Sequence, residues 1–133
     1  MAVQRKITLL YVRKPGETNV NQKLQWLGSS IGLFTLRDKD KSCFRIFIEL
    51  VKTSKRGNPV SSDDLSFRAH LTRGTVVHHL NKLMDSGIVI KERRGYVLRQ
   101  SNLSSLVSGI ENDCIKMCEE LKEMAQDIDE SLS

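Results

Sequence analysis

Hydrophobic residues recur at helical spacing in two stretches of the first 60 residues. The clearest stretch, residues 42–52, carries apolar side chains three and four positions apart: Phe44, Phe47, Ile48 and Val51. This pattern predicts a helix, with Asp40 or Ser42 as its N-terminal cap. A shorter helix is expected over residues 21–27, where Leu24, Trp26 and Leu27 precede Gly28.

Two further helices separated by a tight turn are predicted after the loop Lys55 to Pro59. Ser61, with Asp64 three residues later, resembles a capping box, so a helix is expected to start there and to run to about Ala69. His70 and Leu71 interrupt it, and Thr72 can cap a new helix. That helix is expected to extend from Thr72 to Ser86 and to end where Gly87 can take a left-handed conformation.

The 72–86 helix is predicted to have one apolar and one polar face. At about 100° per residue, four apolar side chains lie within roughly 60° of Leu80: Val76, Val77, Leu83 and Met84. Thr75, His78 and Lys82 lie on the opposite side, and Gly74 and His79 lie on the flanks. The two adjacent histidines are therefore not equivalent.

β-Branched and aromatic residues dominate short runs in two other parts of the chain. Residues 88–100 contain two such runs around Arg93, Arg94 and Gly95, which predicts a hairpin with a cationic tip. Ile7 to Val12 is expected to be a strand that ends in a turn at Lys14-Pro15-Gly16. Two helices joined by a tight turn and followed by a basic hairpin predict a mainly α fold with a small β-hairpin wing (α+β), the winged helix-turn-helix.

The last 33 residues carry a seven-residue repeat of apolar positions. Its members, called the apolar seam below, alternate spacings of four and three: Leu103, Val107, Ile110, Cys114, Met117, Leu121, Met124 and Ile128. This pattern predicts a long helix that pairs with another helix, most simply that of a second subunit. Acidic side chains at Glu111, Asp113, Glu120 and Asp127 flank the seam and would repel one another in a parallel pair. An antiparallel pair, or a mixed bundle that includes the basic N-terminal helix, remains open.

Charge is distributed unevenly along the chain. Residues 101–133 hold two lysines and eight acids, a net of −6, whereas residues 1–100 hold the remaining 19 basic and eight acidic residues, a net of +11. This distribution indicates a body that binds a polyanion and a terminal element with a separate role.

Residues 64–89, DLSFRAHLTRGTVVHHLNKLMDSGIV, resemble the winged helix-turn-helix of ArsR-type and MarR-type transcription regulators, in particular small archaeal ones. The resemblance extends over about residues 42–100. It departs from the family pattern at His70, where the turn usually carries glycine. It also lacks the clustered cysteines or histidine and carboxylate pairs of the metal-sensing members, so no metal site is expected.

The resemblance implies a set of DNA-contacting residues. His78, Thr75 and Lys82 occupy the face that such proteins present to the major groove. His79 takes a position that usually packs or contacts a phosphate, Gly74 would allow close approach of the helix start, and the wing tip would meet phosphates or the minor groove. The candidates are Thr72, Arg73, Gly74, Thr75, His78, His79, Lys82, Arg93 and Arg94.

Together these patterns predict three parts: an accessory segment over 1–40, a DNA-binding domain over 41–100 and a dimerisation helix over 101–133. We expect a homodimeric regulator of transcription that binds double-stranded DNA in the cytoplasm, with a general transcription factor as a further partner of the N-terminal segment.

The sequence shows no apolar run long enough for a membrane span. Catalytic constellations and cofactor motifs are not evident either, so an enzyme is not expected. Two rival hypotheses are a protein-interaction adaptor whose acidic helix binds a partner, and a sensor that uses Cys114 and Cys118; with Cys43 these make an odd count without a disulfide pattern.

Overall fold

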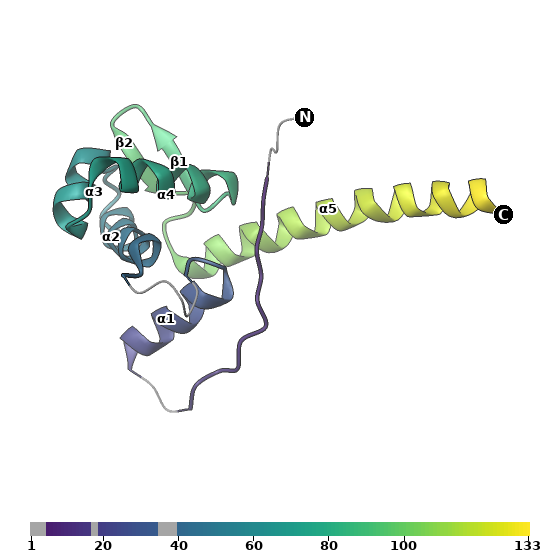
Figure 1. Ribbon diagram of the computed structural model, residues 1–133, viewed down its shortest axis with the longest axis horizontal. Coiled ribbons are helices and arrows are strands. Elements are labelled where there is room, and N and C mark those ends of the chain that lie inside the picture. The colour runs from purple at the N-terminus through teal and green to yellow at the C-terminus, as the bar shows by residue number, and fades with distance from the viewer. Residues whose placement is uncertain (1–4, 17–18, 35–39) are drawn as a thin grey trace.

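The computed structural model describes residues 5–16, 19–34 and 40–133 (Figure 1). In these ranges the elements are α1 (Val20–Ser30), α2 (Ser42–Lys55), α3 (Ser62–Ala69), α4 (Arg73–Asp85), β1 (Val89–Glu92), β2 (Gly95–Leu98) and α5 (Leu103–Leu132). Helices α2, α3 and α4 and the β1–β2 hairpin gather at one end of the molecule, and α5 projects from this body as a single long rod (Figure 1). The fold class predicted from the sequence, a mainly helical winged helix-turn-helix with a long last helix, is confirmed. No helix among the described residues combines the length and the apolar character that a membrane span requires.

Each element of the body contributes a large side chain to one core. Phe47 of α2, Leu65 of α3, Leu80 of α4 and Leu106 of α5 are all almost completely buried, as is Ile88 just before β1. Burial of such a side chain stabilises the fold by about 1.5–3 kcal/mol. Because the apolar side of α4 lies in this core, its polar side must face outward.

Local capping explains where the two helices of the turn begin and end. The Ser61 hydroxyl accepts a hydrogen bond from the Asp64 amide at 3.1 Å, and the Thr72 hydroxyl accepts one from the Thr75 amide at 3.2 Å. His70 ends α3 in the left-handed region, at φ 55°. The caps at Ser61 and Thr72 agree with the sequence predictions, but among the described residues only the Ser61 half of the predicted capping box is present.

The start of α2 differs from its predicted cap. Lys41, in a left-handed conformation, holds the N-cap position, and Ser42 is the first helical residue. Neither predicted residue is therefore the N-cap, although the Asp40 carboxylate, one residue before it, accepts a hydrogen bond from the Ser42 amide at 3.2 Å.

Gly28 does not end α1, contrary to the sequence prediction. The helix continues through it to Ser30, and Gly28 is buried against α2. A Cβ at this position would lie 2.7 Å from Cδ1 of Phe44, so the glycine serves close packing of α1 and not helix termination.

The hairpin matches its prediction and is tied to the loop before α3. Strand β1 pairs with β2 in antiparallel register from Val89 opposite Leu98 to Glu92 opposite Gly95, which leaves Arg93 and Arg94 as the two-residue turn. Val60 exchanges two backbone hydrogen bonds with Tyr96, at 2.8 and 2.9 Å. These bonds fix the wing relative to the helix-turn-helix.

The predicted strand over residues 7–12 is wrong. Residues 5–16 are extended, but their backbone bonds lead to helix ends and not to a neighbouring strand. The Lys6 amide donates to the carbonyl of Asp85 at 2.9 Å, and the Leu10 amide donates to the carbonyl of Ser30 at 2.8 Å. The segment therefore joins the end of α4 to the end of α1.

Helix α5 confirms the predicted long helix, but its apolar seam has two environments. Ile110 is buried in the body's own core, and Leu103 and Cys114 are partly buried against it. The rest of the seam is exposed: Val107, Met117, Leu121, Met124 and Ile128. The seven-residue pattern cannot distinguish these environments, because both a core contact and a helix pair select an apolar side chain.

Candidate nucleic-acid interface

The polar face of α4 is the centre of the candidate interface. Thr72, His78 and Lys82 are exposed, and Thr75 is half-buried. The opposite stripe is buried at Val76, Leu80 and Leu83, and only partly at Val77 and Met84. The hydrophobic burial of one face thus holds hydroxyl, imidazole and ammonium groups on the outer face, where they can donate hydrogen bonds.

The N-terminus of α4 is open and without acidic residues in its first turn. Apart from its chain neighbours and the adjacent backbone of α4, no atom of the described residues lies within 4 Å of the position that a Cβ on Gly74 would take, so a ligand can approach the backbone there. The Arg73 guanidinium lies 3.5 Å from the Asp63 carboxylate, but both side chains are more than 70% exposed, and such a pair holds weakly. Free helix amides and the helix dipole favour an anion at this end.

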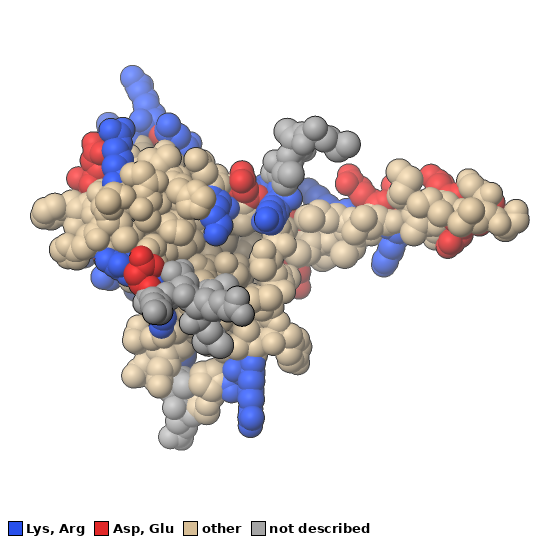
Figure 2. Space-filling view, in the orientation of Figure 1, with Lys and Arg blue, Asp and Glu red and all other residues tan. Residues whose placement is uncertain are grey.

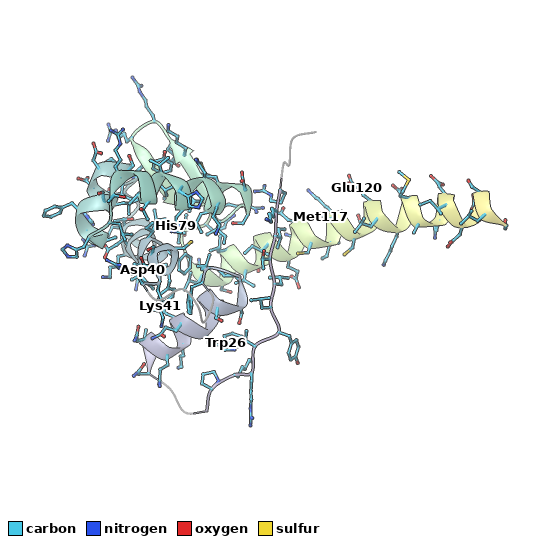
Figure 3. The ribbon with its side chains drawn as sticks, in the orientation of Figure 1. Trp26, Asp40, Lys41, His79, Met117 and Glu120 are labelled. Carbon is cyan, nitrogen blue, oxygen red and sulfur yellow. The ribbon has the colours of Figure 1, made fainter. Side chains whose placement is uncertain are left out.

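The structure separates the two histidines as the helical geometry predicts. His78 is exposed, whereas His79 is half-buried on the side of α4 toward the body (Figure 3). Their rings are in edge contact, with centroids 5.3 Å apart. This burial supports a packing role for His79 and leaves His78 as the accessible imidazole of α4.

The wing places a second group of cations on the same body. Arg93 and Arg94 are exposed at the hairpin tip, and Lys91 on β1 lies with its Nζ 5.7 Å from the ring centroid of Tyr96. Lys and Arg side chains are prominent around the hairpin, whereas Asp and Glu dominate the outer half of α5 (Figure 2). The basic and acidic parts of the sequence thus also lie in different parts of the molecule.

An ion-pair cluster that sequence reasoning missed connects the wing, α5 and the N-terminal segment. Arg99, just after β2, makes two hydrogen bonds to the Asp113 carboxylate of α5, at 2.7 and 3.3 Å. The Arg5 guanidinium lies 3.5 Å from the same carboxylate. The hydrogen bond from Arg99 and the nearby positive charges hold the pKa of Asp113 below its usual value. No local spacing signals this cluster, because its members are 14 or more residues apart.

The two cysteines of α5 differ in their exposure. Cys114 is half-buried and Cys118 is exposed. Within the described ranges, no three histidine, cysteine or acidic residues gather closely enough to bind a metal ion.

Comparison with known proteins gives one match. Residues 54–91 match the family model described as bacterial regulatory protein, arsR family. Searches of curated proteins and of solved structures found no significant match. The matched residues form the end of α2, the helices α3 and α4 and most of β1, so the chain carries a helix-turn-helix of the ArsR regulator type, which indicates a DNA-binding regulator of transcription.

Proposed function

We propose that the protein is a homodimeric, sequence-specific regulator of transcription, in which α4 enters the major groove of double-stranded DNA and the wing contacts the adjacent backbone. The observation that carries the proposal is that the residues similar to arsR-family regulators include the open N-terminus and the exposed polar face of α4. The role is binding and not catalysis.

The geometry supports two kinds of DNA contact, one to base edges and one to the phosphate backbone. An exposed imidazole at His78 and an exposed ammonium at Lys82 suit contacts to base edges, which carry sequence information. The guanidinium groups of Arg93 and Arg94 suit phosphates or a narrow minor groove. Two such modules are needed, since one module offers too small an interface for strong discrimination.

The first experiment measures how salt affects DNA binding. Changing Arg93 and Arg94 together to alanine should weaken binding to every duplex and reduce the salt slope by up to about two units, because phosphate contacts release counterions. A control that changes Lys23 and Lys52 to alanine removes the same charge outside the interface and should leave the slope unchanged. Equal slopes for wild type and the wing variant would contradict the role of the wing.

The second experiment tests sequence recognition. His78→Ala or Lys82→Ala should change the motif recovered by selection from random duplexes more than it changes nonspecific affinity. Recovery of the wild-type motif by both variants would contradict their contact with bases. Binding of no duplex by the wild-type protein would instead favour the adaptor hypothesis.

The third experiment tests the dimer. Met117, Leu121, Met124 and Ile128 are 38–68% exposed on one face of α5, which is unusual for a helix that has no partner. Met117→Lys with Leu121→Lys should yield a monomer that has lost specific DNA affinity, because burial of each seam residue contributes about 1–3 kcal/mol. Sedimentation would refute the proposal if the variant stayed dimeric or the wild type were monomeric at micromolar concentration.

The wider context belongs to the same proposal. The resemblance of residues 64–89 to MarR-type and small archaeal regulators is a sequence inference that supports a role in transcription. Such a regulator acts where the chromosome lies, which agrees with the expected cytoplasmic location. The extended segment 5–16 is exposed over much of its length and could also recruit a general transcription factor.

A further inference from the structure

An apolar groove with a basic rim lies beside the N-terminal end of α5. It has a volume of about 900 Å³ and is lined by residues 9–14, by Trp26, Leu27 and Ile31 around α1, and by Val107 of α5. Leu9, Leu10 and Val107 are 43–59% exposed, so the groove presents apolar surface that nothing in the described chain covers. We call it the N-terminal groove.

Contacts of Trp26 hold one wall of the groove against α1. The Trp26 indole N–H donates a hydrogen bond to the carbonyl of Val12 at 3.0 Å, and the Nζ of Lys14 lies 5.6 Å from the Trp26 ring centroid. The Trp26 side chain thereby connects α1 to the N-terminal segment, and Figure 3 shows it between the two. Arg13 and Lys14 are exposed and form the cationic part of the lining.

The end of α5 has the complementary character. Residues 119–130, the acidic tail, contain six acids and one lysine around the exposed seam residues Leu121, Met124 and Ile128. An amphipathic helix of this kind matches an apolar groove with a basic rim in both hydrophobicity and charge.

The acidic tail cannot reach the groove of its own chain. Val107 and Ile128 are separated by 21 residues of one continuous helix, which places them about 32 Å apart along its axis. The occupant must therefore come from a second molecule.

We propose that the acidic tail of a second copy docks in the N-terminal groove, in an antiparallel arrangement that repeats reciprocally about a two-fold axis. This inference rests on the proposed homodimer and specifies its interface. The spacing of the seam supports it, because the intervals from Leu103 to Ile128 run 4, 3, 4, 3, 4, 3, 4 in either direction. One antiparallel register aligns the two seams, with Val107 opposite Met124 of the second copy and Leu103 opposite its Ile128.

The charges favour this arrangement over a parallel one. In a parallel pair the two acidic tails lie against each other, whereas in the antiparallel pair each tail lies beside Arg13 and Lys14 of the other copy. The seam residue Ile110 is already buried in the body's core and does not contact the partner helix. The partner helix instead contacts Val107 and the lining of the groove.

Charge reversal tests the docking. Arg13→Glu with Lys14→Glu, or Asp127→Lys with Glu130→Lys, should each raise the dimer dissociation constant about a hundredfold at low salt, since four exposed ionic contacts per dimer become repulsive. Mixing the two variants should restore wild-type affinity as a heterodimer, because every tail then meets a groove of opposite sign. Arg68→Glu with Lys91→Glu makes the same change in net charge on α3 and β1, away from the groove, and should have no effect.

Cross-linking gives the orientation directly. In a chain with Cys114→Ser and Cys118→Ser, a mixture of Lys14→Cys and Asp127→Cys proteins should form a cross-linked dimer with a short bis-maleimide. Neither protein alone should do so, since two Asp127 positions of an antiparallel pair lie about 35 Å apart. Cross-linking of the Asp127→Cys protein with itself would show a parallel pair and overturn the proposal.

The outcomes separate this inference from the proposed function. If both charge reversals leave a stable dimer while Met117→Lys with Leu121→Lys dissolves it, the homodimer stands and the docking is wrong. If the mixture fails to restore the dimer although each variant remains helical by circular dichroism, the docking is also wrong. A monomeric wild type would reject the homodimer and this inference together.

Discussion

Removing the charge of Asp113 should loosen the junction of α5 with the body. Asp113→Asn keeps the size of the side chain but loses the charge that attracts Arg99 and Arg5. The Arg99 and Asp113 side chains are 25% and 17% exposed, so solvent screens the pair only in part. We expect a loss of about 1–2 kcal/mol in the free energy of unfolding, near the lower part of the range for hydrogen bonds to charged groups.

The pH dependence of this loss identifies its cause. The folded protein holds the pKa of Asp113 below the ordinary value of 3.8, so the carboxylate contributes stability above that value and loses it as the pH falls through the folded pKa. Urea unfolding of wild type and variant should therefore differ most at pH 6–7 and converge toward pH 3. Asp129→Asn, on the exposed end of α5, is the matched control and should be neutral at every pH. A difference between wild type and Asp113→Asn that stays constant from pH 7 to pH 3 would refute the electrostatic explanation.

Three further substitutions test local features of the DNA-binding domain by thermal or urea unfolding. Gly95→Ala should destabilise by about 2 kcal/mol or more, because φ is +145° and the new Cβ would lie 2.5 Å from the Val60 carbonyl oxygen; a neutral result would contradict this packing. Thr72→Ala should cost about 1 kcal/mol by leaving the Thr75 amide uncapped, whereas Thr72→Ser should restore the cap. His70→Gly should be neutral or stabilise by up to about 1 kcal/mol, since glycine adopts the left-handed conformation without strain, and a clear loss would show that the imidazole matters.

Features that depend on a few neighbouring residues could be predicted from the sequence. Ser61 and Thr72 cap their helices, His70 takes the left-handed turn, and Arg93 and Arg94 form the hairpin tip, because each outcome is determined within about four residues. The polar face of α4 follows from helical geometry alone once the apolar stripe is recognised.

Features that depend on distant parts of the chain could not be predicted. Ile7 to Val12 has the composition of a strand, but its partners are helix ends, and no pattern within the segment indicates that. Gly28 suggests a helix end until the ring of Phe44 is seen against it. Ile110 has the same heptad position as the exposed Met117 and Met124, and only the tertiary fold shows that it already has a partner.

The N-terminal segment contacts both α4, the proposed recognition helix, and α5, the proposed dimerisation helix. The Lys6 amide donates a hydrogen bond to the last carbonyl of α4. The neighbouring Arg5 forms an ion pair with Asp113 of α5, and its guanidinium also lies close to Gly87, immediately after α4. These contacts connect α4 to α5 and restrain the angle between the two helices. In a dimer paired through α5, that angle determines how far apart the two α4 helices lie and therefore which half-site spacing both can occupy at once. The same segment lines the N-terminal groove a few residues later, at positions 9–14. Docking of the second copy's tail would thus act on the segment that holds α4 in place, which gives assembly a direct physical route to the DNA-binding geometry.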